Sequence, residues 1–306
     1  MSILEARQSR RTLLAAFSLP LWATQAMTSS VSASPAVATV VSTRELAIRS
    51  CATSQCSVVD QVPLGASVEL GAESDGAFAR ITYGDVTGFA NKLFLATDPT
   101  HVPYLLSGES GCQRVALIFN VGVGYEPASG IIDTLAAERV PATMFVMGWW
   151  AAEHPKILTR MVEEGYLIGS HGNWSQELTT LSDDDVAADL QNAVEAIEHA
   201  TGKPPAPYFT PYAAAIDERV RAIVAATGVL PVAWEVPAAD YGPDATADAV
   251  YDRVMDEIYD GAIVELHLDG PASAESTGRA LPRLIRDLRA QNYRFVTIPE
   301  MIEPCL

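Results

Sequence analysis

The feature that most constrains the fold is a repeated alternation of apolar runs and helical patterns in the second part of the chain. Six runs are typical of buried strands: Val115–Phe119, Thr143–Met147, Leu167–Gly169, Leu230–Trp234, Ala262–Leu266 and Arg294–Ile298. Amphipathic helical patterns lie between them: Ser129–Glu138, Trp150–Glu164, Asp183–Ala200, Asp217–Thr227, Ala247–Tyr259 and Arg279–Gln291. This alternation predicts an α/β domain over residues 111–306 with a parallel sheet, open or closed into a barrel. A functional site is then expected at the carboxyl ends of the strands.

The chain before this domain has a different pattern. Short β-like runs separated by turn residues extend from Val40 to Leu95, and no helical period of useful length interrupts them. They predict a small all-β domain over residues 40–97. A linker over residues 98–110, with Pro99, Pro103 and Gly108, connects the two domains.

The first 34 residues are typical of an export signal peptide. Arg7, Arg10 and Arg11 precede the uncharged run Thr12–Ala26, which is too short to span a bilayer as a settled helix. The order S-R-R-T-L-L at Ser9–Leu14 also resembles a twin-arginine signal. We expect this segment to be removed and the mature protein to be periplasmic, cell-wall associated or extracellular, with no membrane span. An N-terminal membrane anchor is the alternative.

Cysteine usage agrees with export. The four cysteines all lie after the predicted signal, two close together and two near the ends of the α/β segment. An even number in an oxidising compartment suggests the pairs Cys51–Cys56 and Cys112–Cys305. Free, buried cysteines are the alternative.

Composition excludes some partners. The chain has 306 residues, of which 49% are hydrophobic, so it can bury a large core. Its 20 basic and 38 acidic residues give a net charge of −18, which repels both phosphate backbones and anionic lipids. Nucleic acid and membrane surfaces are therefore not expected as partners.

Polar and aromatic residues gather where the predicted strands end. In chain order these ends are Asn120–Gly122, Ser170–Ser175, Tyr208–Tyr212, Trp234–Tyr241 and Glu265–His267. Their order and spacing resemble the polysaccharide deacetylases (NodB-homology, carbohydrate esterase family 4), as do P-A-T-M-F-V-M-G-W-W and G-A-I-V-E-L-H around them. The resemblance covers about Arg114 to Ile302. It implies a distorted (β/α) barrel that uses a divalent metal, often zinc, to remove acetyl groups from N-acetylated sugars in chitin or peptidoglycan.

The preceding all-β segment resembles the bacterial SH3-like domains. The resemblance rests on Ile48-Arg49-Ser50, Pro63-Leu64-Gly65 and Thr87-Gly88-Phe89. It implies that this domain attaches the protein to cell-wall glycan or peptidoglycan peptides. A domain that acts only as a spacer is the alternative.

The resemblance assigns roles to positions whose residues differ from the family pattern. The motif T-F-D-D-G places Asn120 at the catalytic base and Val121 at a metal ligand. The motif H-x-x-x-H places His171 and Ser175 at the other two ligands. In place of R-x-P-Y the chain has Thr210-Pro211-Tyr212, without the arginine that orients the base.

The last two family motifs are better preserved. Asp240 and Tyr241 match the fourth motif, and His267 matches the general acid of L-x-H, in a slightly different register. Asp269, close to His267 in the chain, is a candidate partner for this acid. We expect Trp174, Tyr212, Asp240 and Tyr241 to contact substrate, by stacking in the case of the aromatic residues. The alternative for both His171 and His267 is a purely structural role.

The replaced residues lack the chemistry that their positions require. A catalytic zinc generally has three protein ligands and an open position for water. The side chain of Val121 has no donor atom, neutral Ser175 is a poor ligand, and the Asn120 amide cannot accept a proton at neutral pH. We therefore expect no bound cofactor, unless zinc or another divalent ion binds a rearranged site. Asn173, Glu126, Glu235, Asp240 and Asp269 are the candidates for such a site.

Two functions remain open, and a third, an unrelated α/β enzyme with a serine nucleophile, is disfavoured because Ser170 and Ser175 lie in no G-x-S-x-G turn. The first is an exported protein that binds N-acetylated envelope glycan of the peptidoglycan or chitin type, with lost or impaired deacetylation, which makes it a pseudoenzyme. The second is an active deacetylase that hydrolyses N-acetyl or O-acetyl groups through a rearranged metal site, with His267 as the acid.

Overall fold

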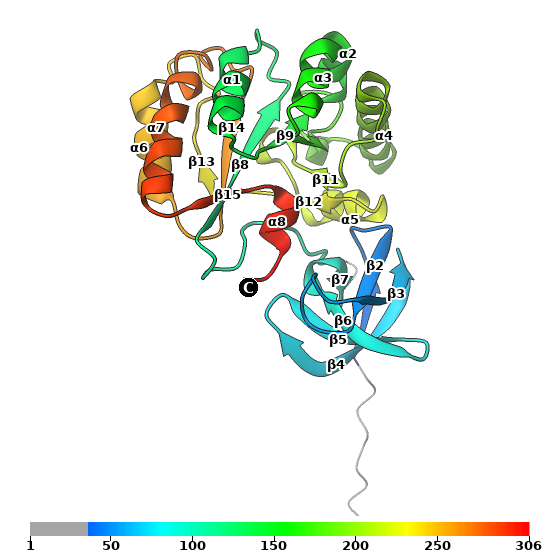
Figure 1. Cartoon of the computed structure of the whole chain (residues 1–306). Helices are drawn as coiled ribbons and strands as arrows, with labels where there is room; N and C mark the ends of the chain where they lie inside the picture. The colour runs from blue at the N-terminus through cyan, green and yellow to red at the C-terminus, as the bar shows by residue number, and fades with distance from the viewer. Residues whose placement is uncertain (1–35, 99, 306) are drawn as a thin grey trace, which may run out of the picture. The chain divides into compact units, whose positions relative to one another are not determined.

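Two β-sheets organise the part of the chain that the structure describes, residues 36–98 and 100–305 of the computed structural model. Both lie within one compact unit, Pro35–Leu306, and are shown in Figure 1. The predicted export signal lies outside the described residues. Within these ranges we find no helix with the length and apolar character needed to cross a lipid bilayer.

The first sheet is antiparallel and has the strand order β3-β2-β6-β5-β4-β1-β7. Its elements are β1 (Ala36–Val40), β2 (Glu45–Arg49), β3 (Val58–Pro63), β4 (Ser67–Asp75), β5 (Phe78–Tyr83), β6 (Val86–Asn91), the short 3-10 helix η1 (Lys92–Phe94) and β7 (Leu95–Ala96). The all-β prediction is confirmed for this part of the chain. It begins earlier than expected, because β1 starts at Ala36 and pairs with both β4 and β7. The resemblance to SH3-like domains stays a prediction.

The second sheet is parallel. Seven of its strands have the order β12-β11-β10-β9-β8-β14-β13, and β15 also pairs with β8. The strands are β8 (Arg114–Val121), β9 (Thr143–Val146), β10 (Leu167–Ser170), β11 (Tyr208–Phe209), β12 (Leu230–Pro231), β13 (Val236–Pro237), β14 (Ala262–His267) and β15 (Arg294–Val296). Each of the six predicted strand-like runs overlaps one of these strands, and β8, β10 and β14 extend beyond the predicted ends. The sequence signal missed the two-residue strands β11 and β13, which are too short to show a period.

The helices surround this sheet, most of them on its outside and the last one against the hydrophobic side chains of its inner face (Figure 1). They are α1 (Ser129–Glu138), α2 (Gly148–Glu153), α3 (Pro155–Glu163), α4 (Asp183–Thr201), α5 (Glu218–Ala226), α6 (Ala247–Glu257), α7 (Thr277–Ala290) and α8 (Ile298–Ile302), with 3-10 helices η2 (Leu178–Thr180) and η3 (Tyr212–Ala214). The single helix expected over Trp150–Glu164 is wrong, because the chain breaks at His154 and α3 restarts at Pro155. Proline disfavours helical geometry in the preceding residue and lacks an N–H, so it starts a new helix there.

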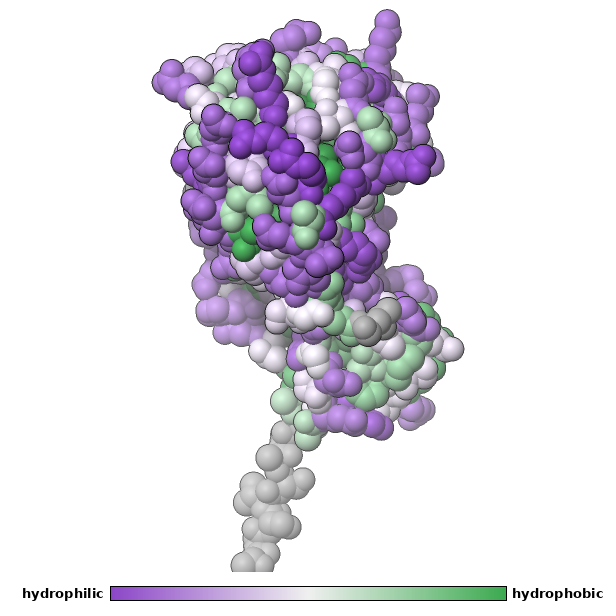
Figure 2. Space-filling model, turned by 60° about the vertical axis from the view of Figure 1, so that its left-hand side comes forward, coloured by the Kyte–Doolittle hydropathy of each residue, from purple (hydrophilic) through white to green (hydrophobic). Residues whose placement is uncertain are grey.

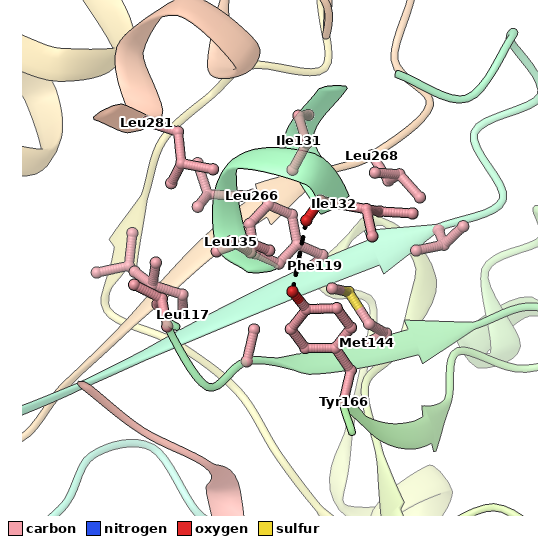
Figure 3. Close-up of a cluster of buried hydrophobic side chains, with 14 of the residues drawn as sticks. Leu117, Phe119, Ile131, Ile132, Leu135, Met144, Tyr166, Leu266, Leu268 and Leu281 are labelled. Carbon is pink, nitrogen blue, oxygen red and sulfur yellow. Dashed lines mark hydrogen bonds between the residues drawn. The ribbon is translucent and has the colours of Figure 1, made fainter. Parts of the chain in front are cut away.

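Side chains of the central strands alternate between two hydrophobic clusters. The outer cluster packs against the helices, and its labelled members in Figure 3 are Leu117, Phe119, Ile131, Ile132, Leu135, Met144, Tyr166, Leu266, Leu268 and Leu281. The inner cluster contains Ala116, Ile118, Phe145, Val232, Ile263 and Val296. Because strand side chains have a period of two, Asn120 lies on the inner face of β8 and Val121 on the outer face. Which residues at the end of a strand face the inside of the curved sheet is therefore decided by which of its alternate positions carry the buried hydrophobic side chains.

The surface contrasts with this interior. On the face shown in Figure 2, the α/β part is covered mainly by hydrophilic residues, with hydrophobic residues in small groups. That distribution agrees with the net charge of −18. The apolar side chains that give the sequence its periodicity therefore point inward, where they pack between the sheet and the helices.

Both predicted disulfides are present. Cys51 and Cys56 are bonded, with a Cα–Cα distance of 5.7 Å, and Cys112 and Cys305 are bonded, with a Cα–Cα distance of 5.2 Å. The second disulfide joins residues 193 positions apart, whereas the first joins residues five positions apart. The long-range disulfide ties the start of the α/β part to its end.

This difference in loop length predicts unequal effects on stability. In the chain-entropy model, Cys112→Ala/Cys305→Ala should lower the free energy of unfolding by about 5 kcal/mol, and Cys51→Ala/Cys56→Ala by about 2 kcal/mol. Urea unfolding of the two double variants beside the parent protein measures both values. Equal losses would contradict the view that the long disulfide stabilises mainly by restricting the unfolded chain.

Candidate functional site

Three polar side chains meet on the inner face of the sheet where β8 and β14 end. The strand register places His267 opposite Asn120 and Glu265 opposite Ile118. The Asn120 Nδ2 atom donates to Glu265 Oε1 at 3.2 Å, and His267 Nε2 lies 3.2 Å from the same oxygen. The exposed fractions of Asn120, Glu265 and His267 are 2%, 4% and 7%. Two adjacent strands thus bring an amide, a carboxylate and an imidazole into contact in a nearly buried place.

A chain of hydrogen bonds extends this cluster to the other side of the curved sheet. His171, after β10, has its Nδ1 atom 2.9 Å from both the carbonyl oxygen and the hydroxyl oxygen of Thr210, which follows β11. The Thr210 hydroxyl donates to Asn120 Oδ1 at 2.9 Å. Because β9 and β10 lie between β8 and β11 in the sheet, this bond spans its concave side. The curvature of the barrel is what brings these residues together.

The direction of every bond in this chain is set by its neighbours. A carbonyl oxygen only accepts, so His171 Nδ1 carries the proton and donates to Thr210. The Thr210 hydroxyl then donates a hydrogen bond to Asn120 Oδ1, so the Asn120 amide nitrogen faces Glu265. Donors therefore converge on Glu265 Oε1, and the unprotonated nitrogen of His171 is Nε2.

His267 is held by Asp240. Its Nδ1 atom lies 2.8 Å from Asp240 Oδ1, and its backbone N–H donates to Asp240 Oδ2 at 2.9 Å. Thr277 also donates to Asp240 Oδ2. Asp240 is fully buried, so its predicted contact with substrate is wrong and its role is to position His267.

Asp269 has a different role from the one expected of it as a partner for His267. Its carboxylate accepts from the backbone N–H groups of Gly122 at 3.0 Å and of Val123 and Gly124 at 3.2 Å. Gly122 has φ +130°, and a Cβ atom there would lie 2.6 Å from the Met147 side chain, which explains the glycine. Successive N–H groups in such a turn form an anion-binding nest, and Asp269 fills it.

The electrostatics of the two histidines differ sharply. Burial lowers the pKa of His171 to about 3, against a weaker opposing effect of its bond to Thr210, so this ring is neutral. Burial also lowers the pKa of His267, but the hydrogen bond to Asp240 and the negative charges of Glu265 and Asp240 outweigh it and raise the pKa to about 9. Burial raises the pKa of Glu265, and the nearby His267 opposes that shift. At neutral pH, His267 is therefore a cation that lies between the carboxyl groups of Asp240 and Glu265.

The positions expected for metal ligands do not fit a metal ion. Val121 is fully buried in the outer hydrophobic cluster. The Ser175 hydroxyl donates to the Gly122 carbonyl at 3.0 Å. His171 is the one matched ligand position that retains a donor suited to zinc. A divalent ion therefore lacks the three-ligand set that its chemistry requires.

The proposed replacement ligands do not assemble either. Asp240 and Asp269 are occupied by protein donors, and Glu235 accepts from the hydroxyl of Tyr259. Across residues 36–98 and 100–305 there is no group of three or more His, Cys, Asp or Glu side chains arranged to hold a metal ion. The rearranged site considered from the sequence, which also drew on Glu126 and Asn173, is not formed by these residues.

We call Asn120, His171, Thr210, Glu265 and His267 the polar centre. Aromatic side chains lie beyond it, on loops at the same edge of the sheet. Trp174 and Tyr241 have exposed fractions of 58% and 59%, and Tyr125, which the sequence analysis did not select, has 52%. The ring of Tyr241 lies edge-on to His267, with 5.8 Å between centroids. Tyr212 is half-buried, 6.3 Å from the His171 ring. Tyr212 and Tyr241 thus lie beside the two histidines, Trp174 lies on the loop after β10, and the role of all three in binding remains a prediction.

Sequence reasoning missed Glu265 and Thr210 as parts of the centre. Glu265 stands where the L-x-H motif has leucine, and the motif match to His267 predicts no role for it. The available signal was the period of two along β14, which puts Ile263, Glu265 and His267 on one face. Thr210 gave no comparable signal, because its partner Asn120 is 90 residues away in the chain.

Comparisons with known proteins agree with this architecture. Residues 107–232 match the family described as Polysaccharide deacetylase. The chain is 30% identical over 199 residues to the peptidoglycan-N-acetylmuramic acid deacetylase PdaA of Bacillus subtilis, which covers 64% of this chain and 73% of that protein. It is 29% identical over 222 residues to the peptidoglycan-N-acetylglucosamine deacetylase PgdA of Listeria monocytogenes, which covers 72% of this chain but only 45% of that protein.

A solved structure is also similar. It is a CE4 family pseudoenzyme from Bacillus anthracis, with a TM-score of 0.58 and 27% sequence identity, and the match covers 64% of this chain and 68% of that one. The expected distorted (β/α) barrel is thereby confirmed, together with an antiparallel sheet that precedes it.

The charge state of the two histidines predicts how stability depends on pH. The raised pKa of His267 gives a contribution that is complete below its ordinary pKa of 6.5 and is lost, up to about 3 kcal/mol, as the pH rises through about 9. The lowered pKa of His171 gives a loss as the pH falls from 6.5 toward 3, because the unfolded chain then binds an extra proton. Urea unfolding between pH 3 and 10 measures both limbs.

Single variants show which histidine causes the loss of stability at alkaline pH (the alkaline limb) and which contributes to the loss at acid pH (the acid limb). His267→Gln should flatten the alkaline limb and leave the acid limb, and His171→Gln should do the reverse in part, since carboxylates also titrate there. An alkaline limb of unchanged slope in His267→Gln would refute the assignment.

The pairing of Asn120 with Glu265 predicts a rescue experiment. Asn120→Asp replaces a buried N–H donor with a second carboxylate 3.2 Å from Glu265, so the free energy of unfolding at pH 7 should fall by about 2 kcal/mol. Adding Glu265→Gln exchanges donor and acceptor and should restore at least half of that loss. Losses that simply add in the double variant would show that the two residues do not depend on each other.

Proposed function

Because this chain belongs to the polysaccharide deacetylase family, we propose that it binds envelope glycan of the peptidoglycan or chitin type and does not remove acetyl groups from it. The glycan would lie across the carboxyl-terminal edge of the parallel sheet. Its sugar rings would stack on the exposed faces of Trp174 and Tyr241. The protein would thus bind the class of glycan on which the family acts, without the family's deacetylation.

The observation that carries this proposal is the identity of the residues at the metal and base positions. Val121 belongs to the hydrophobic core, the Ser175 hydroxyl is bonded to a backbone carbonyl, and Asn120 presents an amide where the base is needed. When bound, a divalent metal would supply an activated water and a Lewis acid for the oxyanion. Only His171 among these positions could hold it, so no deacetylation route is assigned to this chain.

The polar side chains at this site bind one another through hydrogen bonds. Glu265 Oε1 takes up the donors of Asn120 and His267, so these N–H groups are satisfied without an added ion. His267, which the family would use as an acid, is held between Asp240 and Glu265, and the residues at the matched ligand positions do not supply the metal that would activate a water beside it. This supports a binding role for the centre.

The proposal also covers location and the first domain. The two disulfides support an oxidising compartment, and the relatives named above are peptidoglycan deacetylases. We propose that the protein is exported, periplasmic, cell-wall associated or extracellular, and that the antiparallel domain binds cell-wall glycan or peptidoglycan peptides. The export route through a twin-arginine signal is part of the same proposal.

The test combines metal analysis, activity and binding. We expect purified protein, dialysed against zinc, to hold well under one zinc per chain, to release no acetate from chitin oligomers or peptidoglycan, and still to bind them. Mass spectrometry of the metal, an acetate assay and calorimetry measure the three. Stoichiometric zinc together with zinc-dependent acetate release would establish the active deacetylase instead.

A pair of variants tests the stacking role. Trp174→Ala should weaken glycan binding about tenfold, because it removes an exposed aromatic face, whereas Trp174→Phe should retain most of the affinity. If neither variant changes binding, the glycan lies elsewhere on the protein.

A further inference from the structure

Two buried residues of the polar centre each keep one acceptor atom without a partner. The proton on His171 Nδ1 leaves a lone pair on Nε2, and the donors of Asn120 and His267 both meet Oε1 of Glu265, which leaves Oε2. Within residues 36–98 and 100–305, neither Nε2 of His171 nor Oε2 of Glu265 has a hydrogen-bond partner. Both residues are only 4% exposed.

These two atoms are nevertheless open to something that enters the site. The fully enclosed side-chain atoms without partners, within the described ranges, belong to Ser42, Arg114, Trp150, Arg221 and Glu303. His171 and Glu265 are not among them, so the residual exposure of each includes its free acceptor. A buried acceptor that is reachable and unpaired is a place where a ligand donor gains most.

The chemistry of these atoms selects the ligand group. Both are acceptors, and one belongs to a carboxylate that shares a single cation, His267, with Asp240. An acetamido group offers one N–H donor and brings a carbonyl acceptor and a methyl group. A protonated amine offers three donors and a positive charge, and hydrogen bonds to charged groups are about twice as strong as neutral ones. The centre therefore suits a cationic donor better than an acetylated nitrogen.

We propose that the sugar unit held at this centre carries a free amino group, as in a de-N-acetylated glucosamine unit of an otherwise acetylated envelope glycan. Its ammonium donates to Glu265 Oε2, and a sugar hydroxyl donates to His171 Nε2. This inference rests on the proposed glycan-binding function and adds that the chain recognises the chemical product of deacetylation. Glu265, on the strand next to Asn120, is the specificity-determining residue.

The test compares three oligomers with the same β-1,4 backbone: fully deacetylated chitosan hexamer, fully acetylated chitin hexamer and cellohexaose. Calorimetry with the full chain uses a pH at which the amine is protonated and salt high enough to screen the net charge of −18. We expect the amino oligomer to bind about tenfold or more tightly than the acetylated one. Cellohexaose, which retains only stacking and hydroxyl contacts, should bind more weakly than the amino oligomer.

Two variants separate the site from general charge attraction. Glu265→Gln should remove most of the preference for the amine, and Glu257→Gln, which changes an exposed carboxylate on α6, should leave the preference intact. Equal losses in both variants would mean non-specific attraction of a polycation and would overturn the inference. If Glu265→Gln does not fold, the affinities of the three oligomers for the parent protein still show whether the amino oligomer is preferred.

The outcomes also distinguish this inference from the function on which it rests. If none of the three oligomers binds, glycan binding itself fails. If the acetylated oligomer binds as tightly as the amino oligomer or more tightly, glycan binding stands and recognition of the free amine is wrong.

Discussion

The polar centre depends on the contact between Asn120 and Glu265. Strands β8 and β14 are neighbours, and their register places both side chains on the inner face of the sheet. The amide donates to the carboxylate, which leaves the Asn120 oxygen to accept from the Thr210 hydroxyl, and the Thr210 carbonyl in turn accepts from His171. A carboxylate on β8 would place two negative groups in contact, whereas an amide there makes the carboxylate on β14 acceptable. Asn120 and Glu265 are thus physically matched to each other.

The fold is stabilised by residues that lie outside this polar centre. The outer faces of the same strands carry Leu117, Phe119 and Leu266, which pack against the helix layer (Figure 3). Burial of each such side chain is worth about 2 kcal/mol, and this does not depend on what the inner face carries. Val121 belongs to the same layer and is fully buried in it. Packing on one face and chemistry on the other can therefore change independently.

Much of the fold could be predicted from local patterns, and the site only in part. Helix α1 was predicted over its observed range, because its period and length are strong, while the break at His154 was missed although Pro155 signalled it. At the site, the matched positions of Asn120, Val121 and His171 were found from motif spacing. The predicted substrate contact of Asp240 was wrong, because it came from the match to the fourth family motif, and the sequence does not show that this carboxyl group is buried.

The sequence by itself determined the alternation of strands and helices, the residues at the strand ends and the chemistry that those residues lack. It could do so because side-chain period, turn composition and ligand chemistry are local properties. Only the tertiary structure decided that His267 pairs with Asp240, that Asp269 fills a backbone nest, and that Glu265 collects the donors of the centre. These contacts join residues on different strands and loops, and the curvature and register of the sheet, which no single segment encodes, bring them within hydrogen-bonding distance.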